Sequence, residues 1–168
     1  TSTVATFTIE DTTAPEVTDA MDATAECDGA GNGDELTAWL ANNGGASATD
    51  ACGGVSWSHD FDALSDACGA TGAATVTFTA TDDCGNATST VATFTIEDTT
   101  APEVTDAMDA TAECDGAGNG DELTAWLSNN GGASATDACG GVSWSHDFDA
   151  LSDACGATGG ATVTFTAT

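Results

Sequence analysis

The sequence contains no lysine and no arginine, although 28 of its 168 residues are aspartate or glutamate, which gives a formal net charge of -28. Side-chain salt bridges therefore require a protonated His59 or His146. Nucleic acids and anionic membrane surfaces are both bound mainly through basic side chains. The composition thus excludes nucleic acid and anionic membranes as partners, and the net charge must be balanced by ions from solution.

Tyrosine is also absent, aromatic residues are few, and no run of 18 apolar residues occurs, so we expect no transmembrane helix. Ser58, His59 and Asp60 are consecutive in a predicted strand, where neighbouring side chains point to opposite faces, so they cannot form a catalytic triad. Thin domains dominated by Thr, Val and Ala offer no deep pocket for other chemistry. We therefore expect that the protein is not an enzyme.

Most of the sequence consists of a nearly perfect internal repeat. Residues 1–81 recur at residues 88–168, and only Ala41 and Ala73 are replaced in the second copy, by Ser128 and Gly160. A repeat of this length fits one small domain better than a solenoid coil. We place the boundary at the linker before Pro15. The predicted domains are residues 1–13, the last strand of a preceding repeat; 14–100, a complete repeat; and 101–168, a repeat that lacks its last strand.

Alternation of apolar and polar residues predicts two neighbouring antiparallel strands, at 74–80 and 92–96, joined by turn residues 83–86. Further strands are expected at 23–27, 46–49 and 55–61, with Trp57 in the core. Asp34 is expected to cap a short helix over 35–42. The predicted fold class is all-β: tandem immunoglobulin-like β-sandwich domains with a short helix inserted between the first two strands.

Several of these motifs resemble hyalin-repeat (HYR-like) domains. They are Asp11-Thr12-Thr13-Ala14-Pro15, the segment 48–53, and the segment 76–82 with the Cys84-Gly85-Asn86 that follows it. The segments 26–32 and 36–46 are similar to repeats of very large surface proteins of Bacteroidota. The resemblance implies an extracellular or cell-surface location, an adhesive or filamentous role, and O-glycosylation in the Asp-Thr motifs, at Thr12 and Thr99.

The repeat carries four cysteines, an even number that suits disulfides in an oxidising compartment. The spacings contain no Cys-x2-Cys pair of the kind that zinc sites use. Four cysteines allow three pairings. In an immunoglobulin-like sandwich, Cys27 and Cys68 would lie at one pole, and Cys52 and Cys84 at the other. We therefore predict the bridges Cys27–Cys68, Cys52–Cys84 and Cys114–Cys155, with Cys139 unpaired.

Acidic residues gather at the predicted pole where the linker joins. Because no basic side chain is available, we expect structural calcium, which prefers several oxygen ligands, to bind there; the alternative is a solvated polar hinge. The loop 28–35 is acidic and glycine-rich but lacks the spacing of an EF-hand, and a helix-capping turn is favoured there. The predicted calcium ligands are Glu10, Asp11, Glu16, Asp50, Asp82 and Asp83, and in the second copy Glu97, Asp98, Glu103 and Asp137.

These patterns predict an extracellular structural module that forms a stalk, cable or filament on the cell surface, stiffened by disulfides and calcium. The alternative is an adhesin module that binds a glycan or a protein surface. The expected partners are copies of the protein itself or neighbouring repeats. Strand complementation, in which residues 1–13 of one chain complete the open edge of another, is one expected mode of assembly.

Overall fold

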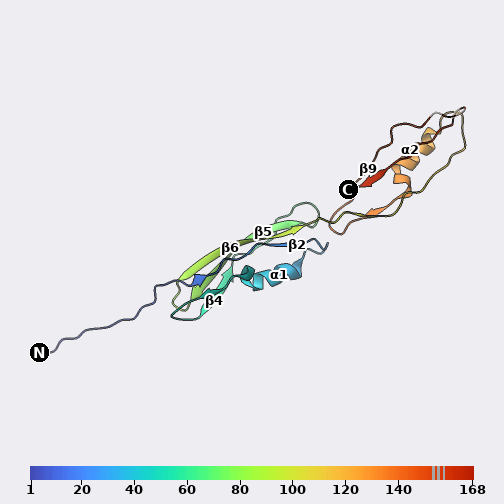
Figure 1. Ribbon diagram of the computed structural model, residues 1–168. Coiled ribbons are helices and arrows are strands. Elements are labelled where there is room, and N and C mark those ends of the chain that lie inside the picture. Colours follow the sequence, from blue (N-terminus) through green and yellow to red (C-terminus); the bar gives the residue numbers. More distant parts are fainter. Residues whose placement is uncertain (153, 155, 157) are drawn as a thin grey trace. The chain divides into compact units, whose positions relative to one another are not determined.

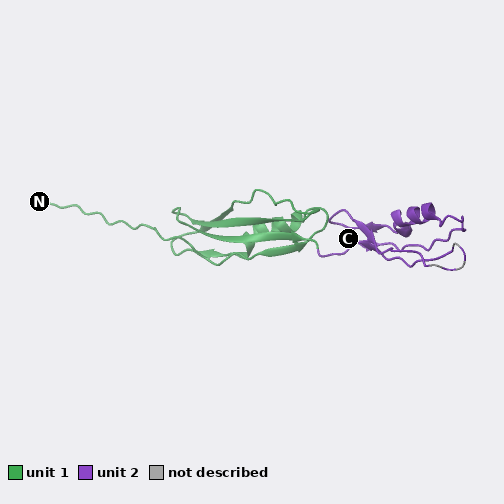
Figure 2. Ribbon diagram, turned by 90° about the horizontal axis from the view of Figure 1, so that it is seen from above, with its two compact units in different colours: residues 1–98 green, residues 99–168 purple. Residues whose placement is uncertain are grey.

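The computed structural model describes residues 1–168 except residues 153, 155 and 157. It divides the chain into two compact units, residues 1–98 and residues 99–168 (Figure 2). Within the first unit, residues 1–10 form no strand and are exposed along their whole length, as the thin trace at the N-terminus shows (Figure 1). The rest of that unit is built around one sheet.

The sheet of the first unit has four strands in the order β2–β6–β5–β4 (Figure 1). Its two long strands, β5 (Gly72–Asp82) and β6 (Ala87–Glu97), form an antiparallel hairpin. β4 (Val55–His59) pairs antiparallel with β5, whereas β2 (Ala23–Glu26) runs parallel to β6. The C-terminal strand of the unit therefore lies inside the sheet, between β2 and β5.

One face of this sheet is the core. Val76 and Phe78 of β5 and Phe94 and Ile96 of β6 are almost fully buried, as the period-two pattern predicts. The residues between them point to the opposite face, where hydroxyls pair across the strands. Thr75 and Thr93 lie 3.0 Å apart through their Oγ1 atoms, and the hydroxyls of Thr79 and Ser89 are also 3.0 Å apart.

The helix α1 (Gly33–Ala41) provides the layer that covers the core face. Its Trp39 and Leu40 pack against the buried residues of β5, and the Trp39 ring meets Phe78 edge-on at 5.2 Å between centroids. The predicted helix is thus confirmed, but its cap is not. Asn32, in the left-handed region at φ 50°, precedes the helix, and Asp34 lies in its first turn.

A tight turn ends α1 against the core. The 3-10 turn η1 (Asn43–Gly45) contains Gly44 at φ 64°. A Cβ atom at Gly44 would lie 3.0 Å from the ring of Phe78 and 3.1 Å from the Cβ of Ala20. Both the backbone angle and the close approach therefore require glycine at this position.

The predicted all-β sandwich is wrong. The fold is mixed α/β, because α1 stands where a sandwich would place a second sheet. The segments expected to build that sheet are too short for it. β1 (Glu16–Val17) and β3 (Ala48–Thr49) pair only with each other, as a ribbon of two residues each. The parallel pairing of β2 with β6 gives the main sheet a mixed strand order.

The second unit repeats the helix but not the sheet. It contains α2 (Gly120–Ser128), the turn η2 (Asn130–Gly132), and two small antiparallel pairs. These pairs are β7 (Glu103–Val104) with β8 (Ala135–Thr136), and β9 (Trp144–His146) with β10 (Phe165–Ala167). Among the described residues of unit 2, no strand corresponds to β6 of unit 1.

Candidate functional site

Two carboxylates and a thiol meet at one end of the first unit. Asp11 lies in the linker, Asp50 directly follows β3, and Cys52 is two residues further on. One ligand atom from each of these residues lies within 4.8 Å of the others. Both carboxylates are half-buried and the thiol is exposed. This group is the strongest candidate for a cation site in unit 1.

Local turns fix the two carboxylates. Asp50 Oδ1 accepts a hydrogen bond of 2.8 Å from the backbone N–H of Cys52, and Asp11 Oδ1 accepts one of 3.1 Å from that of Thr13. Both are the short side-chain-to-backbone bonds that Asp forms readily in turns. The carbonyl of Asp11 also accepts a bond of 3.3 Å from the Asn86 amide, which ties the linker to the β5–β6 hairpin.

Asp82 lies near this group, but its carboxylate accepts hydrogen bonds within the β5–β6 turn. Its Oδ1 accepts bonds of 2.8 Å from the backbone N–H groups of Cys84 and Asn86, and its Oδ2 accepts one of 2.8 Å from the Asn86 side chain. Burial, the largest influence, raises the pKa of Asp82, but the hydrogen bonds from Asn86, Cys84 and Gly85 together lower it below 3.8. Both oxygens of Asp82 are therefore engaged within the turn, and Asp82 is not part of the group formed by Asp11, Asp50 and Cys52.

The other predicted ligands of unit 1 do not join the group. Asp83 Oδ2 accepts a bond of 2.9 Å from Gly54 N–H and fills the space beside Gly53. Glu10 is exposed in the extended segment, and Glu16 is exposed in β1, opposite Thr49. Of the predicted ligands among residues 10–83, Asp11 and Asp50 are the two that belong to this group.

The second predicted cluster is divided between the units. Glu97 ends β6 and Asp98 follows it in the first unit, whereas Glu103 lies in β7 and Asp137 follows β8 in the second. Asp137 Oδ1 accepts a bond of 2.7 Å from Cys139 N–H, the same turn that Asp50 makes. Cys139 is disulfide-bonded, so its sulfur is not a thiolate and offers no strong metal ligand.

The cysteines differ from the predicted pairing. Cys27 and Cys139 are disulfide-bonded and buried, whereas Cys52, Cys68 and Cys84 are free thiols. The predicted bridges Cys27–Cys68 and Cys52–Cys84 are therefore wrong, and so is an unpaired Cys139. They were inferred from the poles of a sandwich that the chain does not form. Cys155 lies outside the described residues, so Cys114–Cys155 stays a prediction.

The acidic residues of this end affect one of its thiols. Burial raises the pKa of Cys84, and the negative charges of Asp11, Asp82 and Asp83 and the neighbouring Cys52 raise it further. The Cys84 thiol is therefore harder to ionise than an ordinary cysteine, which makes it a weaker nucleophile and metal ligand.

The remaining candidates have structural roles or stay predictions. In the loop 28–35, Asp28 Oδ1 accepts bonds from the backbone N–H groups of Ala30 at 2.7 Å and Asn32 at 3.1 Å, which lower the pKa of Asp28. This loop is a turn before α1, as favoured from the sequence. Thr12 and Thr99 are exposed, and glycosylation of these residues remains a prediction.

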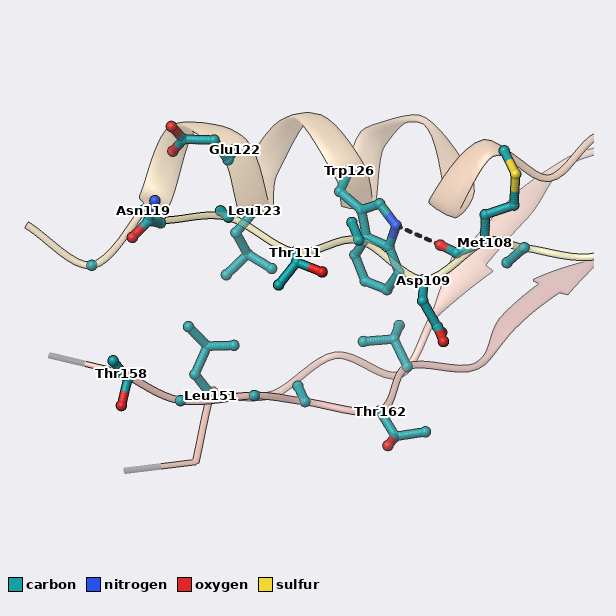
Figure 3. Close-up of a pocket in the computed structure, with 18 of the residues that line it drawn as sticks. Met108, Asp109, Thr111, Asn119, Glu122, Leu123, Trp126, Leu151, Thr158 and Thr162 are labelled. Carbon is teal, nitrogen blue, oxygen red and sulfur yellow. Dashed lines mark hydrogen bonds between the residues drawn. The ribbon is translucent and has the colours of Figure 1, made fainter. Parts of the chain in front are cut away.

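The sequence-based search for sites missed a groove in the second unit. It is a cavity of about 760 Å³ between α2 and two extended segments, with Leu123 and Trp126 of α2 facing Leu151 (Figure 3). Leu123 and Trp126 repeat Leu36 and Trp39, whose spacing indicates the buried face of a helix, so no sequence signal marked them as part of a site. The lining also includes Asp109, Cys114 and Glu122.

Within the described residues, neither helix has the length and apolar character needed to span a membrane. Comparison of the chain with models of known protein families, with curated proteins and with solved structures gives no match.

Proposed function

We propose that this protein is an extracellular structural repeat module that extends a stalk, cable or filament from a cell surface. The observation that carries the proposal is that both sequence copies form the same helix and set its tryptophan in the same contacts. The Trp39 indole N–H donates to the Met21 carbonyl at 3.1 Å, and that of Trp126 donates to Met108 at 3.0 Å. Each indole meets a Phe ring at 5.2 Å.

Duplication of a whole folding module adds length without adding new chemistry, which suits a spacer. The motif resemblance to hyalin repeats and to large surface proteins of Bacteroidota supports the same role. So does the disulfide chemistry, because disulfides persist mainly in oxidising compartments outside the cytosol. The role proposed here is non-enzymatic.

Localisation on the producing cell tests this role. An antibody raised against the 168-residue protein is applied to intact cells and followed by immunogold electron microscopy. Regular labelling along surface fibres or stalks is expected. Labelling confined to the cytoplasm would overturn the proposal.

We further propose that calcium stabilises the linker end of unit 1. Asp11 and Asp50 are held close together in a chain without a single basic side chain to offset their repulsion. Calcium binds carboxylate and carbonyl oxygens, and extracellular modules bind it with dissociation constants of about 0.1–1 mM. The Cys52 thiol is too soft to favour calcium, so in this site the carboxylates are the ligands.

Thermal unfolding with calcium or with EGTA tests the calcium site. At ten times the dissociation constant, calcium should stabilise the fold by about 1.4 kcal/mol. Asp50→Asn should abolish this gain, since it keeps the Oδ1 acceptor of the turn but removes the charge. Asp62→Asn, at an exposed carboxylate with the same change of charge, should retain it. Equal calcium responses in the two variants would exclude this site.

A second role, as an adhesin module, is favoured by the hydroxyl-bearing face of the main sheet. Thr75, Thr79, Ser89 and Thr93 form paired hydroxyls on a face that no other element of the unit covers. Such a face offers donors and acceptors to a glycan or a protein surface. Binding of the protein to a glycan array, lost on substitution of Thr75 and Thr93 by valine, would favour this role over a spacer.

A further inference from the structure

The outer face of the main sheet in unit 1 differs in charge from the rest of the chain. Side chains of β5 and β6 that alternate with the buried core residues point to this face, and residues paired across the strands share it. This surface, the hydroxyl face, consists of an exposed valine and the hydroxyl residues around it, chiefly Val91, Thr75, Thr77, Thr79, Ser89 and Thr93.

The carboxylates of the four strands lie at the strand ends. Glu26 and Glu97 are paired where β2 and β6 end, and Asp82 is buried at the other end of the sheet. β4 contains no carboxylate. The strands therefore place no negative charge in the middle of the hydroxyl face.

Two further carboxylates lie beside the middle of the sheet, one at each edge. Asp22 precedes β2 and its Oδ1 accepts a bond of 2.7 Å from the backbone N–H of Thr93. Asp60 follows β4 and its Oδ1 accepts a bond of 2.7 Å from the backbone N–H of Thr77. Both are engaged with the edges of the sheet, so the hydroxyl face has a neutral centre in a chain of net charge -28.

This centre is also suited to being covered. Val91 is 56% exposed and lies near the middle of β6, opposite Thr77 of β5. Two pairs of hydroxyls at 3.0 Å flank it, Thr75 with Thr93 and Thr79 with Ser89. Because these hydroxyls already have partners within the sheet, removing water from them costs less than removing it from unpaired hydroxyls.

We propose that the hydroxyl face of unit 1 docks on the same face of a second copy of this chain. A two-fold axis near Val91 stacks the two sheets with their long strands antiparallel, as in other isologous contacts. Val91 of each copy then meets Val91 of the other. The two copies of Glu97 lie at opposite ends of the interface, so their charges do not face each other.

The size of the face predicts the strength of this contact. β5 and β6 have 11 residues each, and β2 and β4 have 4 and 5. With a rise of about 3.4 Å per residue and about 4.8 Å between strands, the face covers about 500 Å² per copy. The total of about 1,000 Å² is at the lower limit for a specific complex, so we expect a weak, concentration-dependent dimer.

This inference deepens the structural role and rests on it for its use, because a cable requires contacts between chains that lie side by side. The measurements below use the purified protein and concern association alone. A failed association would leave the localisation experiment untouched. Cytoplasmic labelling, in turn, would remove the surface role without changing the measured association.

Sedimentation equilibrium of the 168-residue protein, in buffer with EGTA, tests the dimer. Association should strengthen between about 0.05 M and about 0.5 M NaCl, because salt screens the repulsion between two anionic chains. Val91→Asp should weaken it at least about tenfold, because it brings two like charges together. Val104→Asp is the matched control, since Val104 is 53% exposed and lies in β7 of unit 2. This control should associate like the unsubstituted protein.

A mixing experiment tests the two-fold arrangement itself. Val91→Lys should also associate weakly alone, whereas an equimolar mixture of Val91→Lys and Val91→Asp should associate more strongly than either variant by itself. Circular dichroism checks that each variant is folded. A protein that stays monomeric up to about 1 mM, with or without glycan binding, would overturn the proposal. So would equal association of Val91→Asp and Val104→Asp, or a mixture that gains nothing.

Discussion

Asp82 shows how single residues organise this anionic protein. A buried carboxylate without a basic partner is costly, yet here hydrogen bonds from Asn86 and from two backbone N–H groups satisfy it. Asp28 and Asp60 follow the same principle, since backbone N–H groups of Ala30 and Thr77 donate to them and lower their pKa values. Backbone N–H groups thus donate to these carboxylates the hydrogen bonds that lysine and arginine side chains donate in other proteins.

The lowered pKa of these carboxyls sets the acid sensitivity of the fold. A folded pKa below 3.8 means that the charged form is favoured by folding. The stability this contributes is present above the unfolded pKa and is lost as the pH falls through the folded value. Asp82→Asn should therefore lower the urea midpoint clearly at pH 7, and the deficit should shrink towards pH 3.

Asparagine is chosen because it removes the charge of Asp82. It also places an amide N–H donor where the Asn86 side chain now finds an acceptor. Asp62→Asn serves as the control, because Asp62 is exposed. An Asp82→Asn deficit of the same size at pH 7 and pH 3 would contradict the linkage.

At the scale of elements, the β5–β6 hairpin and α1 form the packed core of unit 1. Phe78 is fully buried there, with Trp39 on one side and His59 on another, at 5.2 Å and 6.1 Å between ring centroids. Its counterpart Phe165 has the same two ring contacts but is only half-buried.

Truncation of these two rings should therefore have unequal effects. Phe78→Ala should destabilise unit 1 by about 3–5 kcal/mol, the range for a fully buried Phe. Phe165→Ala should destabilise unit 2 by clearly less, and Val91→Ala, at an exposed position, should stay within about 0.5 kcal/mol. Urea unfolding followed by tryptophan fluorescence measures all three. Equal losses of stability at the two phenylalanines would contradict this dependence on burial.

The sequence predicted the elements that depend on local pattern. Alternation along β5 and β6 revealed both the strands and their buried face, and the spacing of Leu36, Trp39 and Leu40 revealed α1. Trp57, expected in the core, packs against it while half-buried. Such periodicities report which face of an element is covered.

Pairing between distant segments was not predictable in the same way. Nothing in the pattern of Ala23–Glu26 states whether its neighbour runs parallel or antiparallel, and the parallel pairing with β6 contradicted the sandwich. The predicted bridges Cys27–Cys68 and Cys52–Cys84 were deduced from the sandwich, so they were wrong for the same reason. At the candidate site, local turns held Asp11 and Asp50 together as expected, but the engagement of Asp82 by Asn86 depended on side-chain geometry.

At the scale of the whole molecule, the two units differ in structure although residues 14–81 and 101–168 have nearly the same sequence. Unit 1 has a four-stranded sheet, whereas the described residues of unit 2 form two pairs of short strands. We therefore expect the two units to differ in stability.

This difference should be visible in calorimetry. We expect two unfolding transitions, the lower one from unit 2, because most of the buried apolar side chains belong to unit 1. Phe78→Ala and Phe165→Ala assign the transitions to their units. A single transition that both substitutions lower equally would contradict independent units.

The interior position of β6 also bears on how the protein folds during synthesis. As unit 1 leaves the ribosome, β2 emerges first but has no partner until residues 94–97 follow, more than half a unit later. The sheet can therefore close only at the end, around a late hairpin, and contacts so distant in sequence slow folding. Until β6 has emerged, the apolar side chains of α1 lack part of their cover and are open to contacts with other unfolded chains.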